Sequence, residues 1–297
     1  MTLLSPAPLR QNRPPLPEEP QLSESDFQRI AAFSQREFGL CQSGDKKQLV
    51  HSRLIRLLRE TGCPDIATLL LRLETDPQCR ERTALISALT TNVTAFFREP
   101  HHFRQLADEL LRPRLEALRR GARLRIWSAG CSAGQEPCSI ALTILDHLPE
   151  ACRLNIRILA TDIDAAMISR ARRGLYSAEE CSGLSAQMER EHFRTTPDGQ
   201  RQIGPEAGEM IRYAALNLIE DWPVQGPFDA IFCRNVAIYF DKPTQMTLWQ
   251  RFARLLAPGG LLFIGHSERV SGPAGDCLTS AGITTYRLSA TPDRRMK

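Results

Sequence analysis

The segment from Leu124 to Leu148 constrains the fold of this 297-residue chain more than any other. A short apolar run, Leu124 to Trp127, leads into a loop with Gly130 and Gly134, and a helix-like run from Ser139 to Leu148 follows. A strand, a glycine turn and a helix in this order are typical of Rossmann-like sheets, where the turn brings the backbone close to a nucleotide-like ligand. The segment therefore predicts an α/β domain with a ligand site at this turn.

The spacing of the glycines indicates which class of nucleotide to expect. Gly130 and Gly134 form a G-x-x-x-G pattern, which differs from the G-x-G-x-x-G pattern of pyrophosphate-binding turns. Glu136 adds a negative charge that would repel a pyrophosphate but would not repel a cationic nucleoside such as S-adenosylmethionine. We therefore expect a sulfonium nucleoside at this turn, and a nicotinamide dehydrogenase is disfavoured.

Composition limits the function classes. With 42% hydrophobic and 24% charged residues, most of the chain should be globular, and a net charge of +4 does not call for nucleic acid. Nine cysteines occur without C-x-x-C spacing, no secretory signal is visible, and no apolar run approaches the roughly 18 residues of a membrane span. We expect a cytoplasmic protein with reduced thiols, no metal site and no direct membrane insertion.

Changes in sequence pattern divide the chain. Residues 1–22 are rich in proline and predict a disordered tail. Helical periodicity with short connections predicts a small helical domain over 23–90, and a linker is expected at 91–104. The α/β domain should occupy 105–297, with a polar insertion at about 174–210 that we expect to be a small antiparallel β-subdomain.

Capping residues predict where the N-terminal helices begin and end. Ser25 and Gln28 resemble a capping box, and Asp45 could cap a second helix, Lys46 to Glu60, that Gly62 ends. Further helices are expected at 65–74 and 81–89.

Strands and helices alternate in the second half of the chain, which predicts a mainly parallel sheet covered on both faces. Strands are expected at 124–128, 156–161, 211–215, 228–233, 261–264 and 284–288, and helices at 139–148, 165–173 and 244–256.

Polar residues follow two neighbouring strands, where a parallel sheet binds its ligand. Asp162 could accept hydrogen bonds from ribose hydroxyls, and Asp164 is a second candidate, but either could instead cap the next helix. Asn217 and Leu218 suit an adenine edge, although a loop asparagine fits the spacing equally well.

The strand ending at Cys233 is followed by Arg234 and Asn235, and Tyr239 comes four residues later. Asn235 could hold the amino-acid end of the cofactor, and the Tyr239 phenol could face the reacting methyl group; purely structural roles are the alternative. The segment Thr91 to Glu99 places two aromatic residues between polar ones. Taken alone, it predicts a packed joint between domains rather than a ligand contact.

Together these motifs resemble the chemotaxis receptor methyltransferases of bacteria, the CheR family. The motifs are T-N-V-T-A-F-F-R-E, S-A-G-C-S-A-G-Q-E-P-C-S, A-T-D-I-D, N-L, F-D-A-I-F-C-R-N-V-x-I-Y-F and A-P-G-G-L-L-F-I-G-H-S-E, in this order between about Ser25 and Leu288. The resemblance implies a helical domain, a Rossmann-like methyltransferase domain and an inserted β-subdomain. It also implies methyl transfer from S-adenosylmethionine to glutamate side chains of chemoreceptors for sensory adaptation, with S-adenosylhomocysteine as product.

The resemblance also implies site residues. Cofactor contacts are implied for Asn92, Thr94, Arg98, Glu136, Asp162, Asn217, Leu218, Arg234 and Asn235, beside Gly130 and Gly134 of the turn. Arg98 and Tyr239 are expected to orient the reacting groups. No catalytic acid or base is expected, because a glutamate with a pKa of about 4.3 is already ionised at pH 7, and in-line displacement depends mostly on positioning.

A basic helix bears on the choice of substrate. Lys46, Arg53 and Arg56 recur at helical spacing, with Arg59 beside them. Most such runs are ordinary solvated faces, but the resemblance to enzymes that act on acidic receptor helices favours a docking surface for the receptor's cytoplasmic helical domain.

Some relatives bind a pentapeptide at the receptor C-terminus through the β-subdomain. Here residues 192–217 are compact, with one clear hairpin turn at 197–200, so we expect a protein that does not depend on the pentapeptide. A monomer is expected as well. A methyltransferase with another protein or small-molecule substrate, and a regulatory module that binds the nucleoside without catalysis, remain open alternatives.

Overall fold

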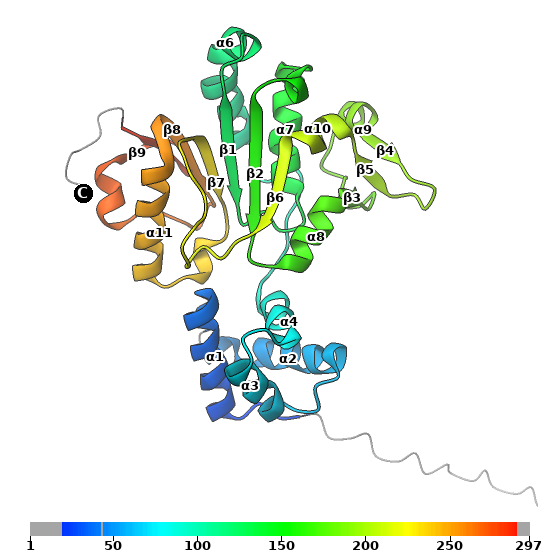
Figure 1. Ribbon diagram of the computed structural model, residues 1–297, viewed down its shortest axis with the longest axis vertical. Coiled ribbons are helices and arrows are strands. Elements are labelled where there is room, and N and C mark those ends of the chain that lie inside the picture. Colours follow the sequence, from blue (N-terminus) through cyan, green and yellow to red (C-terminus); the bar gives the residue numbers. More distant parts are fainter. Residues whose placement is uncertain (1–19, 43, 290–297) are drawn as a thin grey trace, which may run out of the picture.

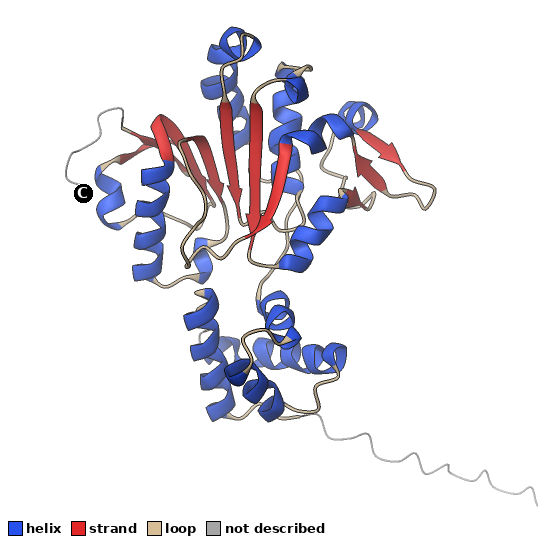
Figure 2. Cartoon of the chain, in the orientation of Figure 1, coloured by secondary structure: helices blue, strands red, loops and turns tan. Residues whose placement is uncertain are grey.

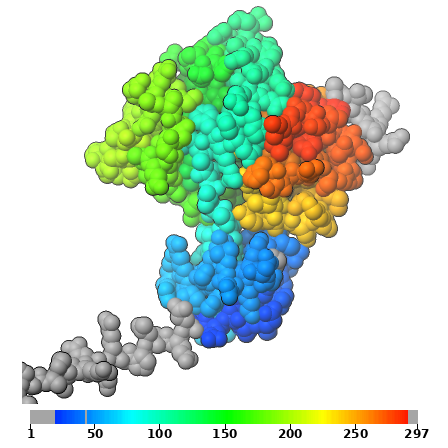
Figure 3. All heavy atoms as spheres, turned by 180° about the vertical axis from the view of Figure 1, so that it is seen from behind, coloured from blue at the N-terminus to red at the C-terminus, as the bar shows by residue number. Residues whose placement is uncertain are grey.

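The computed structural model describes residues 20–42 and 44–289 and places them in two lobes (Figure 1). The smaller lobe contains the N-terminal helices, and the larger one contains a seven-stranded sheet with helices on both faces. Seen from behind, the helical lobe lies beneath the larger one and meets it across a narrower waist (Figure 3). The predicted tail, residues 1–22, lies outside the described residues except for residues 20–22.

The helical lobe consists of α1 (Glu24–Phe38), α2 (Lys47–Thr61), α3 (Ile66–Thr75) and α4 (Arg80–Leu89). Each helix carries apolar residues three or four positions apart, which gives it one apolar face. These faces meet in a single core that includes Phe27, Ile30, Leu54, Leu57, Leu69, Leu70 and Leu85.

The helix ends correct two predictions. Ser23, not Ser25, caps α1, because its extended backbone lets its hydroxyl accept a 3.0 Å hydrogen bond from the backbone N–H of Asp26. Asp45 lies in a 3₁₀ turn, Gly44–Lys46, and α2 begins after it without a side-chain cap. The predicted stop at Gly62 is confirmed, because this glycine adopts the left-handed conformation with φ 65°.

The larger lobe is built on strands in the order β6-β2-β1-β7-β8-β10-β9 (Figure 2). The strands are β1 (Leu124–Ala129), β2 (Ile156–Asp162), β6 (Ile211–Ala215), β7 (Phe228–Cys233), β8 (Leu256–Ile264), β9 (Leu278–Gly282) and β10 (Thr285–Leu288). The first five strands in this order pair in parallel, whereas β10 runs antiparallel to β8 and β9. The predicted mainly parallel sheet is therefore confirmed.

Alternate residues of each strand face opposite cores. Ile126 of β1 belongs to the core beneath α7 (Gln135–His147) and α8 (Ala165–Arg173), and its neighbour Trp127 belongs to the core beneath α11 (Lys242–Leu255). The first of these cores is also covered by helical turns that the sequence did not predict. They are α5 (His101–Gln105), a π-helical turn (Leu106–Leu111), a 3₁₀ turn (Arg112–Arg114) and α6 (Leu115–Arg119).

The polar insertion forms the small antiparallel sheet that was predicted. Its order is β3 (Leu175–Tyr176), β5 (Arg201–Ile203) and β4 (Phe193–Thr195), and the hairpin between β4 and β5 turns at Gly199. Two short helices, α9 (Ala186–His192) and α10 (Pro205–Met210), flank these strands. Within the described ranges, no helix is both long and apolar enough to cross a membrane.

Candidate functional site

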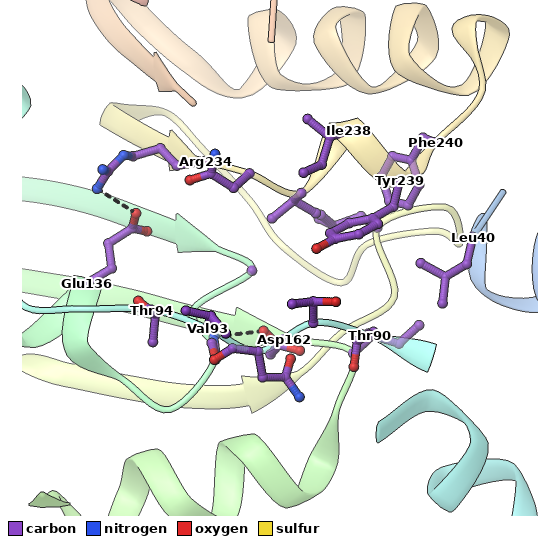
Figure 4. Close-up of a pocket in the computed structure, with 18 of the residues that line it drawn as sticks. Leu40, Thr90, Val93, Thr94, Glu136, Asp162, Arg234, Ile238, Tyr239 and Phe240 are labelled. Atoms are coloured by element: carbon purple, nitrogen blue, oxygen red, sulfur yellow. Dashed lines mark hydrogen bonds and ion pairs between the residues drawn. The ribbon is translucent and has the colours of Figure 1, made fainter. Parts of the chain in front are cut away.

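A pocket opens at the carboxyl ends of β1 and β7, where the order of the strands reverses. From β1 the chain proceeds outward through β2 and β6, and then returns to β7 and β8 on the other side. Open α/β sheets bind their ligands at such a switch point. The pocket is lined by these residues expected from the sequence: Asn92, Thr94, Arg98, Gly130, Glu136, Asp162, Asn217, Leu218, Arg234, Asn235 and Tyr239 (Figure 4 shows many of them).

The helical lobe also contributes to the pocket wall, which the sequence did not predict. Phe38 and Leu40 line the pocket. They are held there because the backbone N–H of Cys41 donates a 2.8 Å hydrogen bond to the carbonyl of Tyr239, and the Asn217 amide donates one of 2.8 Å to the carbonyl of Glu37. In the sequence, Phe38 and Leu40 flank Gly39, and this pattern indicates only an ordinary helix end.

The two glycines of the turn have different surroundings. Gly130 lines the pocket with φ 90°, and a Cβ atom there would collide with Val236. Gly134 does not line the pocket; a Cβ atom there would lie 2.9 Å from the Tyr176 hydroxyl and 3.0 Å from Ala171. Gly130 therefore exposes backbone to the pocket, whereas Gly134 allows the turn to pack against the inserted subdomain.

Asp162 and Asp164 also differ. Asp162 lies at the end of β2, and its two oxygens accept hydrogen bonds from the N–H groups of Ser132 (2.8 Å) and Asp164 (2.9 Å). Burial raises the pKa of Asp162. Asp164 is fully buried and caps α8 by accepting from the N–H groups of Ala166 and Met167, so the capping alternative describes Asp164.

Glu136 is part of a buried ion pair. Its carboxylate accepts 2.7 Å from the Ser128 hydroxyl and 3.2 Å from Arg234, which also donates to the carbonyl of Arg98 (Figure 4 shows the ion pair). Burial raises the pKa of Glu136, and the Arg234 charge opposes that shift. Glu136 is therefore not the unpaired charge expected from the sequence. Arg234 largely neutralises it, so its repulsion of phosphate is weaker than expected.

The linker serves as both a joint and a pocket wall. Phe96 is 4% exposed and packs edge-to-face on Tyr176 with ring centroids 4.9 Å apart, as expected of a packed joint. On its other side, Asn92, Thr94 and Arg98 line the pocket. The interpretation as a joint alone was therefore incomplete.

Tyr239 extends its ring into the pocket from the 3₁₀ turn Ala237–Tyr239 (Figure 4). Among the described residues that line the pocket there is no histidine, lysine or cysteine. The two carboxylates of the lining, Glu136 and Asp162, already accept hydrogen bonds from protein groups. The rest of the lining offers hydrogen-bond donors and apolar surface, which suits the positioning of reactants.

One cluster of possible metal ligands occurs in residues 20–42 and 44–289. Glu99, His101 and His102 each place one ligand atom within 4.8 Å of the others. The guanidinium of Arg234 lies 3.7 Å from Glu99 Oε2, and this positive charge opposes a bound cation. The expected absence of a metal site stays a prediction.

The proposed docking residues lie on or just before α2. Arg56 is exposed and pairs with Glu60 at 2.7 Å, and Lys46 and Arg59 are also exposed. Arg53 instead donates hydrogen bonds to the carbonyl of Leu89 (2.9 Å) and to the Thr91 hydroxyl (3.0 Å). Arg53 therefore connects α2 to the start of the linker.

Family profiles and known proteins match both the helical lobe and the α/β lobe of this chain. The family profile described as "CheR methyltransferase, SAM binding domain" matches residues 92–286, and "CheR methyltransferase, all-alpha domain" matches residues 25–90. A "Probable chemotaxis protein methyltransferase" of Rhizobium etli is 45% identical over 254 residues, which are 84% of this chain and 95% of the relative. The "Chemotaxis protein methyltransferase" of Escherichia coli is 42% identical over 90% of this chain and 92% of its own.

Among solved structures, the N-methyltransferase NodS from Bradyrhizobium japonicum matches with a TM-score of 0.33 and 18% identity, covering 64% of this chain and 96% of its own. That score is too low to support an inference. The two profile matches and the identities to the relatives establish the family directly: the chain belongs to the CheR methyltransferase family and is an S-adenosylmethionine-dependent methyltransferase.

Proposed function

We propose that this protein transfers methyl groups from S-adenosylmethionine to glutamate side chains of bacterial chemoreceptors, giving methyl esters for sensory adaptation. The observation that carries the proposal is a pocket that combines the linker with the carboxyl ends of four strands, β1, β2, β6 and β7. Relatives named as chemotaxis protein methyltransferases support the chemotaxis setting.

The residues of the pocket fit this cofactor. Gly130 leaves backbone exposed, so a ligand can approach it closely. Asp162 offers carboxylate oxygens to ribose hydroxyls, and Asn217 with Leu218 offers an amide and an apolar side chain to the adenine. Arg234, Asn235 and Arg98 would hold the amino-acid end. When bound, S-adenosylmethionine supplies a methyl group attached to a positively charged sulfur.

In the proposed mechanism, the protein positions the target and excludes water. The target glutamate has an ordinary pKa of about 4.3, so it is already a carboxylate at pH 7 and needs no base. The Arg98 guanidinium and the Tyr239 hydroxyl are donors at the pocket that can orient this carboxylate. The apolar Ile238 and Phe240 reduce the water around it, which favours a transition state in which charge is lost.

We assign receptor docking to the exposed basic residues Lys46, Arg56 and Arg59, with Arg53 acting in part through the linker. The short β4–β5 hairpin, which ends in a tight turn, supports independence from a receptor C-terminal pentapeptide. Titration with such a peptide tests this, because binding would contradict it. The proposal includes a cytoplasmic monomer acting on the receptor's cytoplasmic helices.

Calorimetry combined with a methylation assay tests the proposal. The wild-type protein should bind S-adenosylmethionine and S-adenosylhomocysteine and transfer labelled methyl groups to purified receptor cytoplasmic domains. Asp162→Asn should lose most binding, whereas Asp146→Asn, a matched change at an exposed position on α7, should retain it. Binding without transfer to any receptor would favour the regulatory-module alternative.

A further inference from the structure

The loop after β7 holds an unusual backbone conformation at the pocket. Asn235 has φ 60°, in the left-handed region, which asparagine adopts more readily than most non-glycine residues. The loop carries Arg234, Asn235, Ile238 and Tyr239 into the pocket lining. Hydrogen bonds from outside the pocket hold this loop in place.

Glu268 meets this loop from the segment after β8. One carboxylate oxygen accepts hydrogen bonds from the N–H groups of Val236 (3.0 Å) and Ala237 (2.7 Å). The other accepts from the N–H groups of Asn235 (3.0 Å) and Gly265 (2.5 Å). Four backbone donors thus converge on one side chain.

The Glu268 carboxylate makes these hydrogen bonds in a buried position. Glu268 is 5% exposed and does not line the pocket. A buried carboxylate is costly unless it is fully hydrogen-bonded, and here the backbone N–H groups compensate its charge. Gly265 completes the fit, because a Cβ atom there would lie 2.5 Å from the Asn235 amide.

We infer that Glu268 is a positioning residue for the cofactor site. It binds the N–H groups of Asn235, Val236 and Ala237 together and so fixes the left-handed turn that presents Arg234, Asn235 and Tyr239. It does not itself touch the cofactor. This inference rests on the proposed role of that loop in binding S-adenosylmethionine.

The substitution Glu268→Gln tests the inference with little change in shape. The glutamine keeps one acceptor oxygen but turns an NH₂ group toward N–H donors, so two of the four hydrogen bonds become repulsive contacts. The matched control is Glu81→Gln, at a glutamate that is 2% exposed, lies in α4 of the helical lobe and pairs with Arg72.

Two readouts separate positioning from general stability. Calorimetry should show Glu268→Gln binding S-adenosylmethionine about tenfold or more weakly. Hydrogen exchange should show the amides of Asn235, Val236 and Ala237 exchanging about tenfold or more faster, while amides in β1 and β2 keep their rates. Glu81→Gln should change neither readout.

Unchanged affinity or unchanged exchange at these three amides in folded Glu268→Gln would overturn the inference. If this variant does not fold, Glu268→Asp replaces it; its carboxylate is one methylene shorter, so weaker binding is still expected, and wild-type affinity would overturn the inference. Failure of the wild-type protein to bind S-adenosylmethionine would instead contradict the proposed function, so the two failures are distinguishable.

Discussion

Arg234 donates a 3.2 Å hydrogen bond to Glu136, and both side chains are buried at the switch point of the sheet. Because Arg234 also donates to the carbonyl of Arg98, this pair connects the start of α7, the end of β7 and the linker. The pair therefore organises the pocket as well as offering charge to a ligand.

Replacing Glu136 should cost both stability and binding. Glu136→Ala leaves the Arg234 guanidinium buried without this partner, which typically destabilises a protein by about 3 kcal/mol or more. Urea unfolding should show that loss, and calorimetry should show cofactor binding reduced. Ser128→Ala, which removes only the hydroxyl that donates to Glu136, should cost about 1 kcal/mol. Equal stability of Glu136→Ala and wild type would contradict this account.

His102 should make the protein sensitive to acid. Burial, followed by the charge of Arg234, lowers the pKa of His102 from 6.5 to about 3. The folded state thus binds this proton less readily than the unfolded state, so stability is fully present above pH 6.5 and is lost as the pH falls toward 3. Between pH 7 and pH 4 this group should contribute a loss of about 3 kcal/mol.

His102→Gln tests this because the glutamine has no proton to gain. The free energy of unfolding in urea is measured for both proteins at pH 7 and pH 4. The two proteins share all other titrating groups, so the difference between their pH-dependent losses reports His102 alone. Between pH 7 and pH 4 the variant should lose about 3 kcal/mol less stability than the wild-type protein. Parallel losses would show that His102 does not titrate differently in the two states.

Tyr239→Phe should separate binding from transfer. Tyr239 lines the pocket, and the phenylalanine ring of the variant would fill the same space without the hydroxyl. Cofactor affinity should stay within about twofold, while the rate of methyl transfer should fall about tenfold or more, because the hydroxyl no longer orients the reacting carboxylate. Rapid-quench single-turnover assays measure the transfer step directly. An unchanged rate would remove Tyr239 from the catalytic residues.

Charge reversals on α2 should divide docking from cofactor binding. Arg56→Glu with Arg59→Glu should raise the KM for the receptor about tenfold and leave cofactor affinity unchanged. Arg53→Glu should also weaken cofactor binding, because it breaks the hydrogen bonds to Leu89 and Thr91 at the start of the linker. Arg112→Glu, an exposed control whose arginine pairs with Asp108 four residues away, should change neither quantity. Normal receptor methylation by the Arg56 and Arg59 double variant would contradict the docking role.

Most strands of the sheet could be predicted because each has a local sequence signal. β6 and β7 have their predicted bounds, since continuous apolar or alternating runs and flanking turns mark them. β9 was missed, because Leu278–Gly282 is a short, mostly exposed edge strand with little apolar signal. The true start of β8 at Leu256 was also missed, because Pro258 and two glycines resemble a turn although they continue a strand with a register shift.

The lining of the pocket was predicted as far as local motifs reach. The strand-end residues Asp162 and Asn235 line the pocket as expected, because parallel strands end at one edge of the sheet. Phe38, Leu40 and Glu268 were not found, because each reaches the pocket or its supporting loop only through contacts between distant segments. Gly134 shows the converse: its place in the glycine motif suggested a ligand contact, but tertiary packing assigns its space to Tyr176.

Methyl transfer to a defined receptor site tests the central claim most directly. The protein is incubated with labelled S-adenosylmethionine and purified receptor cytoplasmic domains, either wild type or with the methyl-accepting glutamates replaced by alanine. The account predicts label on the wild-type domain as base-labile methyl esters, and little or none on the alanine variant. Equal labelling of the two domains, or no labelling by a protein that binds the cofactor, would contradict it.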